Sequence, residues 1–292
     1  MFQLLKAFVL IAFLALGAIF VVRTDFVSVV PPDIEKYIPA AESINTVTPP
    51  KKTEPKVSAP PPLRAATQGS PDALLTKAGT ISWTNVQRVD NNLSSLKENA
   101  MLDAAATAKA NDMFAKQYFA HASPSGAGPS DIAKQAGYEF IAVGENLALG
   151  NFDGDKALVQ AWMDSPGHRA NILRSQYEEI GVAVVQGMYE GHRTWIAVQE
   201  FGRPLSSCPP PNEALKTTIE TNQNILDEWQ KALDAQKAQL DAMQPKRGFE
   251  YNQKANEYND FVNRYNALLA ETKPLINQYN AQAEVFNVCI KQ

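Results

Sequence analysis

Two histidines and one glutamate stand in the most distinctive short phrases of the sequence. They are His121 in FAHASP, Glu145 in GENLA and His168 in WMDSPGHRANIL. The chain has only 3 histidines, and an imidazole can exchange a proton near pH 7 or bind a metal ion. We therefore predict that these three side chains converge at one site.

Three kinds of chemistry are open to this trio. Two neutral imidazoles and a carboxylate can hold a zinc ion with one position left for water. The same groups can form an acid–base pair in which Glu145 orients a histidine, or a structural polar network at a binding cleft. Ser123 and Ser165 lie near the histidines in sequence, but adjacency does not make a catalytic triad. We assign no catalytic residue and favour binding over catalysis.

The elements that must position the trio lie in residues 71–205, which read as one compact α/β domain. Apolar periodicity predicts helices over residues 84–92, 99–117 and 155–164, and a short helix capped by Ser130 that stops at Gly137. Short apolar runs predict strands over residues 138–143, 180–185 and 194–201. Residues 186–193 are expected to form a hairpin loop, in which His192 is exposed and has no functional role.

The N-terminal part of the chain differs in composition. Residues 7–22 are apolar and uncharged, at the short end of the length that crosses a bilayer. We predict that residues 1–24 are a transmembrane signal-anchor; a signal peptide cleaved after Ala15-Leu16-Gly17 is the alternative. Either way the rest of the chain is expected to be extracytoplasmic, as a single-pass membrane protein or as a secreted one.

A proline-rich stretch follows the predicted anchor. Residues 31–62 hold 9 of the 19 prolines. Proline fixes φ and lacks an amide donor, so it is poorly suited to helix or sheet. Residues 25–70 are therefore predicted to be a disordered, extended linker.

The C-terminal part, residues 206–292, has the heptad pattern of two long helices. Its first half follows the spacing of a coiled-coil seam, with Asn222 and Gln236 as polar interruptions. In its second half a Tyr-Asn pair recurs with a period of seven, and Pro274 is expected to bend that helix without ending it. With a turn at residues 244–248, the prediction is an antiparallel hairpin. Its tyrosines form either a packing seam or a stripe that binds a protein partner.

The two cysteines flank this hairpin. Cys208 lies 38 residues before Lys246 in the expected turn, and Cys289 lies 43 residues after it. An antiparallel hairpin brings both to the same end, so in an oxidising compartment we predict a disulfide between them. Two unrelated thiols are the alternative.

Several phrases in the predicted α/β domain occur together in one order. Among them are Asn85-x-x-Arg88, Tyr118–Pro124, Ala136-Gly137-Tyr138, Gly144–Ala148, Trp162–Arg169, Ile180-Gly181-Val182 and Gln199–Gly202. Through these phrases residues 72–204 resemble the bacterial branch of the CAP superfamily, the SCP-like cysteine-rich secretory, antigen 5 and pathogenesis-related proteins. The resemblance implies an α-β-α sandwich with a cleft that holds two histidines and two carboxylates.

Three of those four cleft residues have matches here, namely His121, Glu145 and His168. The nearest candidate for the second carboxylate is Asp164, only four residues before His168. Glu200 is another carboxylate that could reach the cleft.

The whole chain is therefore predicted to have an α+β fold, a CAP-type sandwich between a membrane anchor with its linker and a helical hairpin. The net charge of −4 gives no electrostatic signature of nucleic-acid binding. Together with the predicted anchor, this favours a membrane-tethered domain, and the resemblance implies that it binds a lipid or cell-wall ligand at the His/Glu cleft, with or without zinc. The alternatives are a hydrolase of envelope peptide or polymer, and an interaction protein that acts through the hairpin.

Overall fold

The computed structural model describes residues 56–65 and 73–291, which divide into two compact units. One unit holds the described residues up to Pro209 and those from Val288 onward, and the other holds Pro210–Asn287. The predicted anchor and the linker residues 25–55 and 66–70 lie outside the described residues. Within the described ranges, no helix has both the length and the apolar character needed to cross a membrane.

A six-stranded mixed sheet forms the centre of the first unit. Its strands are β1 (Lys56–Ser58), β2 (Leu63–Arg64), β3 (Lys97–Glu98), β4 (Phe140–Gly150), β5 (Glu179–Tyr189) and β6 (His192–Pro204). The order is β1-β4-β6-β5-β3, and β2 also pairs with β4. The three long strands are antiparallel neighbours. The strands β5 and β6 contain those predicted at residues 180–185 and 194–201, whereas β4 starts at Phe140 and overlaps the strand predicted at residues 138–143. All three run further than predicted, so the hairpin turns at Glu190 and Gly191 instead of over residues 186–193.

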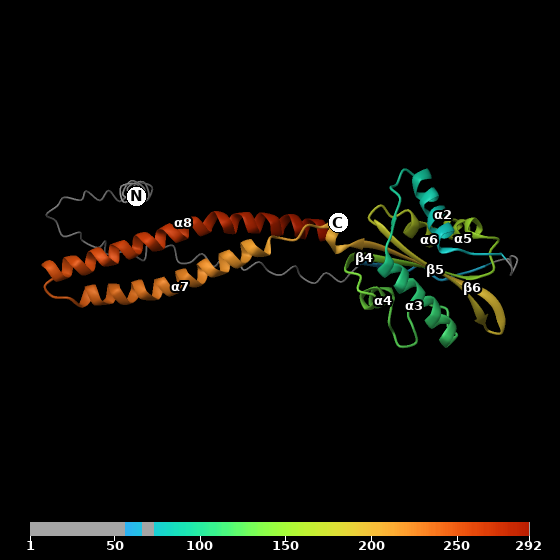
Figure 1. Cartoon of the computed structure of the whole chain (residues 1–292), viewed down its shortest axis with the longest axis horizontal. Helices are drawn as coiled ribbons and strands as arrows, with labels where there is room; N and C mark the ends of the chain where they lie inside the picture. The colour runs from blue at the N-terminus through green and yellow to red at the C-terminus, as the bar shows by residue number, and fades with distance from the viewer. Residues whose placement is uncertain (1–55, 66–72, 292) are drawn as a thin grey trace. The chain divides into compact units, whose positions relative to one another are not determined.

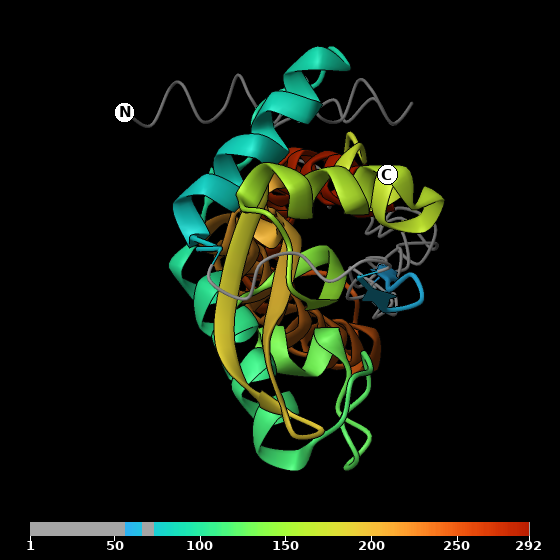
Figure 2. The same cartoon turned by 90° about the vertical axis from the view of Figure 1, so that its right-hand side faces the viewer.

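Helices cover both faces of this sheet, in agreement with the predicted sandwich (Figures 1 and 2). On one face lie α2 (Lys77–Asp90), α5 (Asp155–Asp164) and α6 (Pro166–Ile172), and on the other lie α3 (Ala100–Lys116) and α4 (Pro129–Gln135). The helix α3 approaches the sheet very closely. A Cβ added to Gly181 on β5 would lie 2.1 Å from the backbone carbonyl carbon of Leu102.

The helix bounds correct two expectations. The helix α2 begins at Lys77 rather than residue 84, because the Thr76 side chain accepts a hydrogen bond from the amide of Gly79. Ser130 lies inside α4 and does not cap it. The helix α5 ends at Asp164 as predicted, and Pro166 starts the next helix, α6, where a missing amide donor is tolerated.

Residues 56–65, which we call the strap, fall inside the predicted disordered linker, and for them that prediction is wrong. Lys56–Ser58 pairs in parallel with residues 142–144 of β4, and Leu63–Arg64 pairs with residues 148–149. The prolines at positions 60, 61 and 62 between them have no amide to donate. The strap therefore adds two short edge strands to β4, separated by an unpaired proline stretch.

The second unit consists of two long helices, α7 (Glu213–Ala242) and α8 (Phe249–Lys291), joined at the predicted turn. The buried α7 residues recur every seven positions, at Ile219, Leu226, Leu233 and Leu240, and α8 contributes buried tyrosines to the shared core. Pro274 lies within α8, which continues past it. Asn222 donates a hydrogen bond of 3.0 Å to Thr272, at the position where the tyrosine repeat is skipped. The hairpin is confirmed, while coiled-coil geometry stays a prediction.

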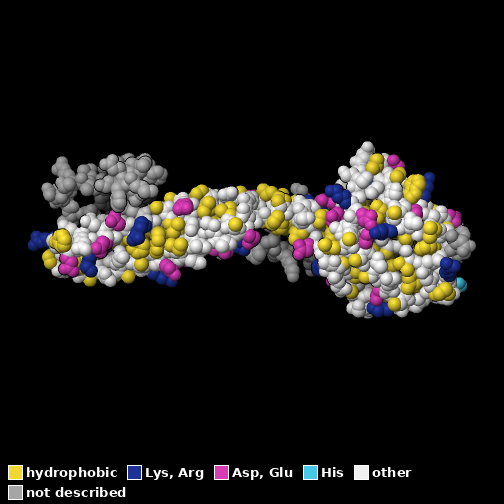
Figure 3. All heavy atoms as spheres, viewed as in Figure 1, with side chains coloured by type: hydrophobic (Ala, Val, Ile, Leu, Met, Phe, Trp, Pro, Cys, Tyr) yellow, Lys and Arg dark blue, Asp and Glu magenta, His cyan; other side chains and the backbone are white. Residues whose placement is uncertain are grey.

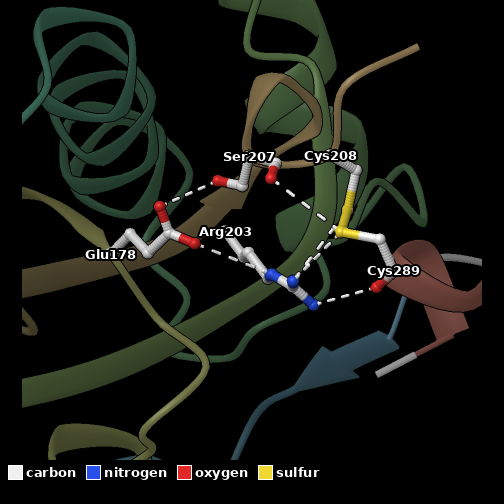
Figure 4. Close-up of a disulfide and its surroundings, with 5 residues drawn as sticks. All are labelled: Glu178, Arg203, Ser207, Cys208 and Cys289. Atoms are coloured by element: carbon white, nitrogen blue, oxygen red, sulfur yellow. Dashed lines mark hydrogen bonds and ion pairs between the residues drawn. A yellow bond between two sulfur atoms is a disulfide. The ribbon is translucent and has the colours of Figure 1, made fainter. Parts of the chain in front are cut away.

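The predicted disulfide joins Cys208 to Cys289, with their Cα atoms 5.7 Å apart (Figure 4). Arg203 lies beside it and donates to the Cys289 carbonyl at 3.3 Å, and its Nε lies 3.7 Å from the Glu178 carboxylate. On the face shown in Figure 3, acidic and basic side chains are both present on each unit.

Candidate functional site

The pairing of β4 with β6 brings two glutamates together. Glu145 lies directly opposite Glu200 in the antiparallel register, and opposed residues project from the same face of a sheet. This is the face that packs against α3, because Leu147 and Val198, two positions along each strand, belong to the α3 core. Both carboxyl groups are fully buried. Glu200, named as a second choice in the sequence analysis, is thus the carboxylate next to Glu145.

His121 follows α3 and touches Glu145. Its Nδ1 lies 2.5 Å from Glu145 Oε1, and its Nε2 lies 2.5 Å from the backbone carbonyl oxygen of Pro60 in the strap. A carbonyl only accepts, so Nε2 carries a proton and donates it. One proton must also lie between His121 Nδ1 and Glu145 Oε1. The pair is then either an imidazolium with a carboxylate or a neutral imidazole with a carboxylic acid.

A buried lysine on α3 completes this network. Lys109 is fully buried, and its Nζ donates to the His121 carbonyl oxygen at 2.6 Å and to the Tyr118 hydroxyl at 3.3 Å. Burial lowers the pKa of Lys109, while the charges of Glu145 and Glu200 act in the opposite direction. Lys109 therefore fixes the backbone of His121 and places a positive charge near the two carboxyl groups.

Glu200 holds its proton more tightly than an ordinary glutamate does. Burial, followed by the charge of Glu145, raises the pKa of Glu200 well above its ordinary value. The pair therefore retains a proton on Glu200 at a pH at which an exposed glutamate has lost it.

His168 lies close by but makes different contacts. Its Nδ1 is 2.8 Å from the hydroxyl of Ser165, and its Nε2 is buried without a hydrogen-bond partner among the described residues. Burial, with a smaller contribution from His121, lowers the pKa of His168 to about 4. His168 is therefore neutral near pH 7, and the hydrogen bonds of the described site link only His121 and Glu145 of the predicted trio.

The opposite face of the same strands carries an amide network that holds α6 against β4. Asn146 donates to the His168 carbonyl and to Gln199, each at 3.2 Å. Gln199 in turn donates to Thr84 on α2 at 2.6 Å. Adjacent residues of β4 thus serve two faces, with Glu145 on the side of α3 and Asn146 on the side of α6.

Two other predicted candidates lie outside the site. Asp164 is exposed and accepts a hydrogen bond from Gln160 on its own helix, so it is not the second carboxylate. Ser123 bonds Ser125 and the amide of Ala127 within its loop, which gives it a structural role there.

The arrangement does not fit a zinc ion held by His121, Glu145 and His168. Both ring nitrogens of His121 face acceptors and neither offers a free lone pair. Across residues 56–65 and 73–291, no three His, Cys, Asp or Glu side chains are grouped so that they could hold a metal ion. We therefore derive no step through a metal ion.

Two contributors to the site, Lys109 and Pro60, were not predicted from the sequence. Lys109 occupies the buried stripe of α3 with Leu102, Ala106 and Met113. A lysine at the three- and four-residue spacing of an apolar stripe indicates a buried charge, so Lys109 could have been identified from the sequence. Pro60 gave no such signal, because its role depends on a backbone carbonyl.

Comparisons with known proteins agree with this architecture. Residues 82–201 match the model of the cysteine-rich secretory protein family, CAP. The chain is 39% identical over 106 residues to the uncharacterized protein YkwD of Bacillus subtilis, and 34% identical over 109 residues to the uncharacterized membrane protein YlbC of the same species. These matches cover 36% and 37% of this chain, but only 41% and 31% of the two relatives.

One solved structure is also similar to part of this chain. An extracellular protein containing an SCP domain from Bacillus anthracis is 29% identical, with a TM-score of 0.38, over 44% of this chain and 40% of its own. Residues 82–201 thus form a domain that matches the CAP family of cysteine-rich secretory proteins.

Proposed function

We propose that the CAP domain is an extracytoplasmic, membrane-tethered binding module that recognises a carbonyl-containing ligand of the cell envelope through His121. The observation that supports this is the bond from His121 Nε2 to the carbonyl oxygen of Pro60. One ring nitrogen is held by the buried Glu145, and the other is offered as a donor.

The surroundings make this donor a rigid one. Glu145 is fixed in the sheet, and Lys109 holds the backbone of His121. A donor held in place by packed neighbours loses little conformational entropy when it binds an acceptor. The acceptor in the structure is a peptide carbonyl, which favours a wall polymer with amide groups over a lipid.

A sedimentation experiment tests this proposal. The full chain in detergent is incubated with purified cell-wall sacculi, and separately with phosphatidylglycerol vesicles, as wild type, His121→Phe and His192→Phe. His192 is exposed, so it provides a matched control. Loss of a hydrogen bond from a buried polar group is worth about 1.5–3 kcal/mol, or roughly ten-fold or more in affinity.

We expect His121→Phe to bind sacculi at least ten-fold more weakly than the other two proteins. The predicted anchor contributes equally to all three, so only the difference between variants counts. Equal sedimentation of wild type and His121→Phe with sacculi would contradict the proposal. A difference seen only with vesicles would assign the ligand to lipid instead.

Hydrolysis is a second candidate, because a histidine in contact with a buried carboxylate is the arrangement of an oriented acid–base group. Release of soluble fragments from sacculi by the wild type, lost in a folded Glu145→Gln variant, would support it. Binding without release would leave the binding module as the function.

A further inference from the structure

The strap places one residue, Pro60, directly in the candidate site. Pro60 is buried, whereas its neighbours Ala59 and Pro61 are exposed. Its carbonyl oxygen accepts the hydrogen bond from His121. Its ring lies against Gly167 at the start of α6, where an added Cβ would come within 2.6 Å of Pro60 Cβ. The absence of a side chain at Gly167 therefore leaves the space that the Pro60 ring occupies.

The strap also pairs through its backbone, since Lys56–Ser58 and Leu63–Arg64 pair with the edge of β4. The side-chain amide of Asn171 donates to the carbonyls of Ser58 at 3.3 Å and Glu145 at 3.2 Å. Leu63 and Ala65 pack against the domain core, and Arg64 lies over the rings of Phe119 and Tyr189. Pro60 is the only buried residue of the strap. Backbone pairing combined with side-chain contacts is how proteins recognise extended peptides by strand addition.

We propose that this edge of β4 is a groove for an extended, proline-containing peptide, and that the strap is its resident occupant. An incoming peptide would pair in parallel with β4, place a proline against Gly167 and offer that proline's carbonyl to His121. This rests on the proposed function and deepens it by naming the ligand class.

The strap then acts as a built-in competitor. A tethered segment has an effective concentration on the order of millimolar. A free peptide with the same contacts is therefore excluded until its concentration approaches that value or the strap is weakened. Its two strands are only three and two residues long, so a single substitution at Pro60 is expected to release it.

A peptide titration tests both parts of the proposal. A fluorescently labelled peptide with the sequence of residues 56–65, KVSAPPPLRA, is titrated with the full chain, and its anisotropy is measured. Pro60→Glu places a carboxylate at the buried position against Gly167 and should release the strap, so the peptide should bind at least ten-fold more tightly than to wild type. Pro61→Glu is the matched control, because Pro61 is exposed, and it should behave as wild type.

A second substitution tests the contact between the proline ring and Gly167. Gly167→Ala, added to Pro60→Glu, fills the space against the proline ring while alanine remains favourable within a helix. The peptide should then bind at least ten-fold more weakly than to Pro60→Glu alone. Circular dichroism verifies that each variant is folded; if Pro60→Glu does not fold, Pro60→Gly removes the ring alone and should give a smaller increase.

The proposal is overturned if the folded Pro60 variant binds the peptide no more tightly than Pro61→Glu, or if Gly167→Ala leaves the binding unchanged. The peptide titration and the sacculus experiment can fail independently of each other. Sacculus binding that depends on His121 without peptide binding would reject only the groove. Peptide binding without sacculus binding would retain the groove and reject the envelope ligand.

Discussion

Acidification should destabilise the CAP domain through His168. The pKa of this buried histidine is lowered from 6.5 to about 4. Between these values the unfolded chain takes up a proton that the folded chain does not. The contribution of His168 to stability is therefore complete above pH 6.5 and is lost as the pH falls towards 4. A difference of 6.5 − 4, or about 2.5 pH units, corresponds to about 3 kcal/mol, of which about 2 kcal/mol falls between pH 7 and pH 5.

Glu200 acts in the opposite direction, so wild type alone does not isolate this effect. The raised pKa of Glu200 gives stability that is present below its ordinary value and is lost as the pH rises through its folded value. The quantity to measure is thus the difference between wild type and His168→Asn. Asparagine keeps a hydrogen-bonding group for Ser165 but does not titrate.

Urea unfolding at pH 7, 6 and 5, followed by tryptophan fluorescence, measures this difference. Trp83, Trp162 and Trp195 report on the CAP domain, out of 4 tryptophans in the chain. Between pH 7 and pH 5 the wild type should lose about 2 kcal/mol more than His168→Asn, and His192→Asn should follow wild type because His192 is exposed. Parallel curves for wild type and His168→Asn would refute the reasoning.

Three further predictions concern the network, the disulfide and the hairpin. Lys109→Met leaves the His121 carbonyl without its charged donor and should lower the free energy of unfolding at pH 7 by about 1.5–3 kcal/mol; an unchanged free energy of unfolding in urea titration would contradict the assigned network. Cys289→Ser should lower it by about 2–4 kcal/mol, and dithiothreitol should destabilise wild type but not this variant. Asn222→Ala leaves the buried Thr272 hydroxyl without its donor and should cost about 1 kcal/mol, seen as a lower thermal midpoint by circular dichroism; an unchanged or higher midpoint would show that the contact is not stabilising.

Side-chain patterns made much of the fold predictable. The helix α5 has the predicted bounds, residues 155–164, because its apolar stripe and the proline after it are both local signals. The seam between α7 and α8 was predictable for the same reason, and it led to the disulfide. The strap was not predictable. Its pairing uses backbone amides and carbonyls along one edge of β4, which no pattern of side chains encodes, and its prolines indicated the opposite.

The position of the candidate site was predictable from the sequence, but the contacts between its side chains were less so. Distinctive phrases located His121 and Glu145, which do touch. The partner of Glu145 depends on the register of β4 against β6, which sets Glu200 opposite it and excludes Asp164. A register is a long-range property, so spacing along the chain favoured a nearby carboxylate over the correct one.

The disulfide makes the helical hairpin a covalently closed loop. Cys208 and Cys289 are separated by 81 positions, and the turn at residues 244–248 between α7 and α8 is exposed. Exposed turns are preferred sites of proteolytic cleavage. Outside the cytoplasm, where we propose that the chain acts, a single cut in this turn would leave both helices attached to the CAP domain. A molecule cleaved in this turn therefore loses no fragment until the Cys208–Cys289 disulfide is also reduced.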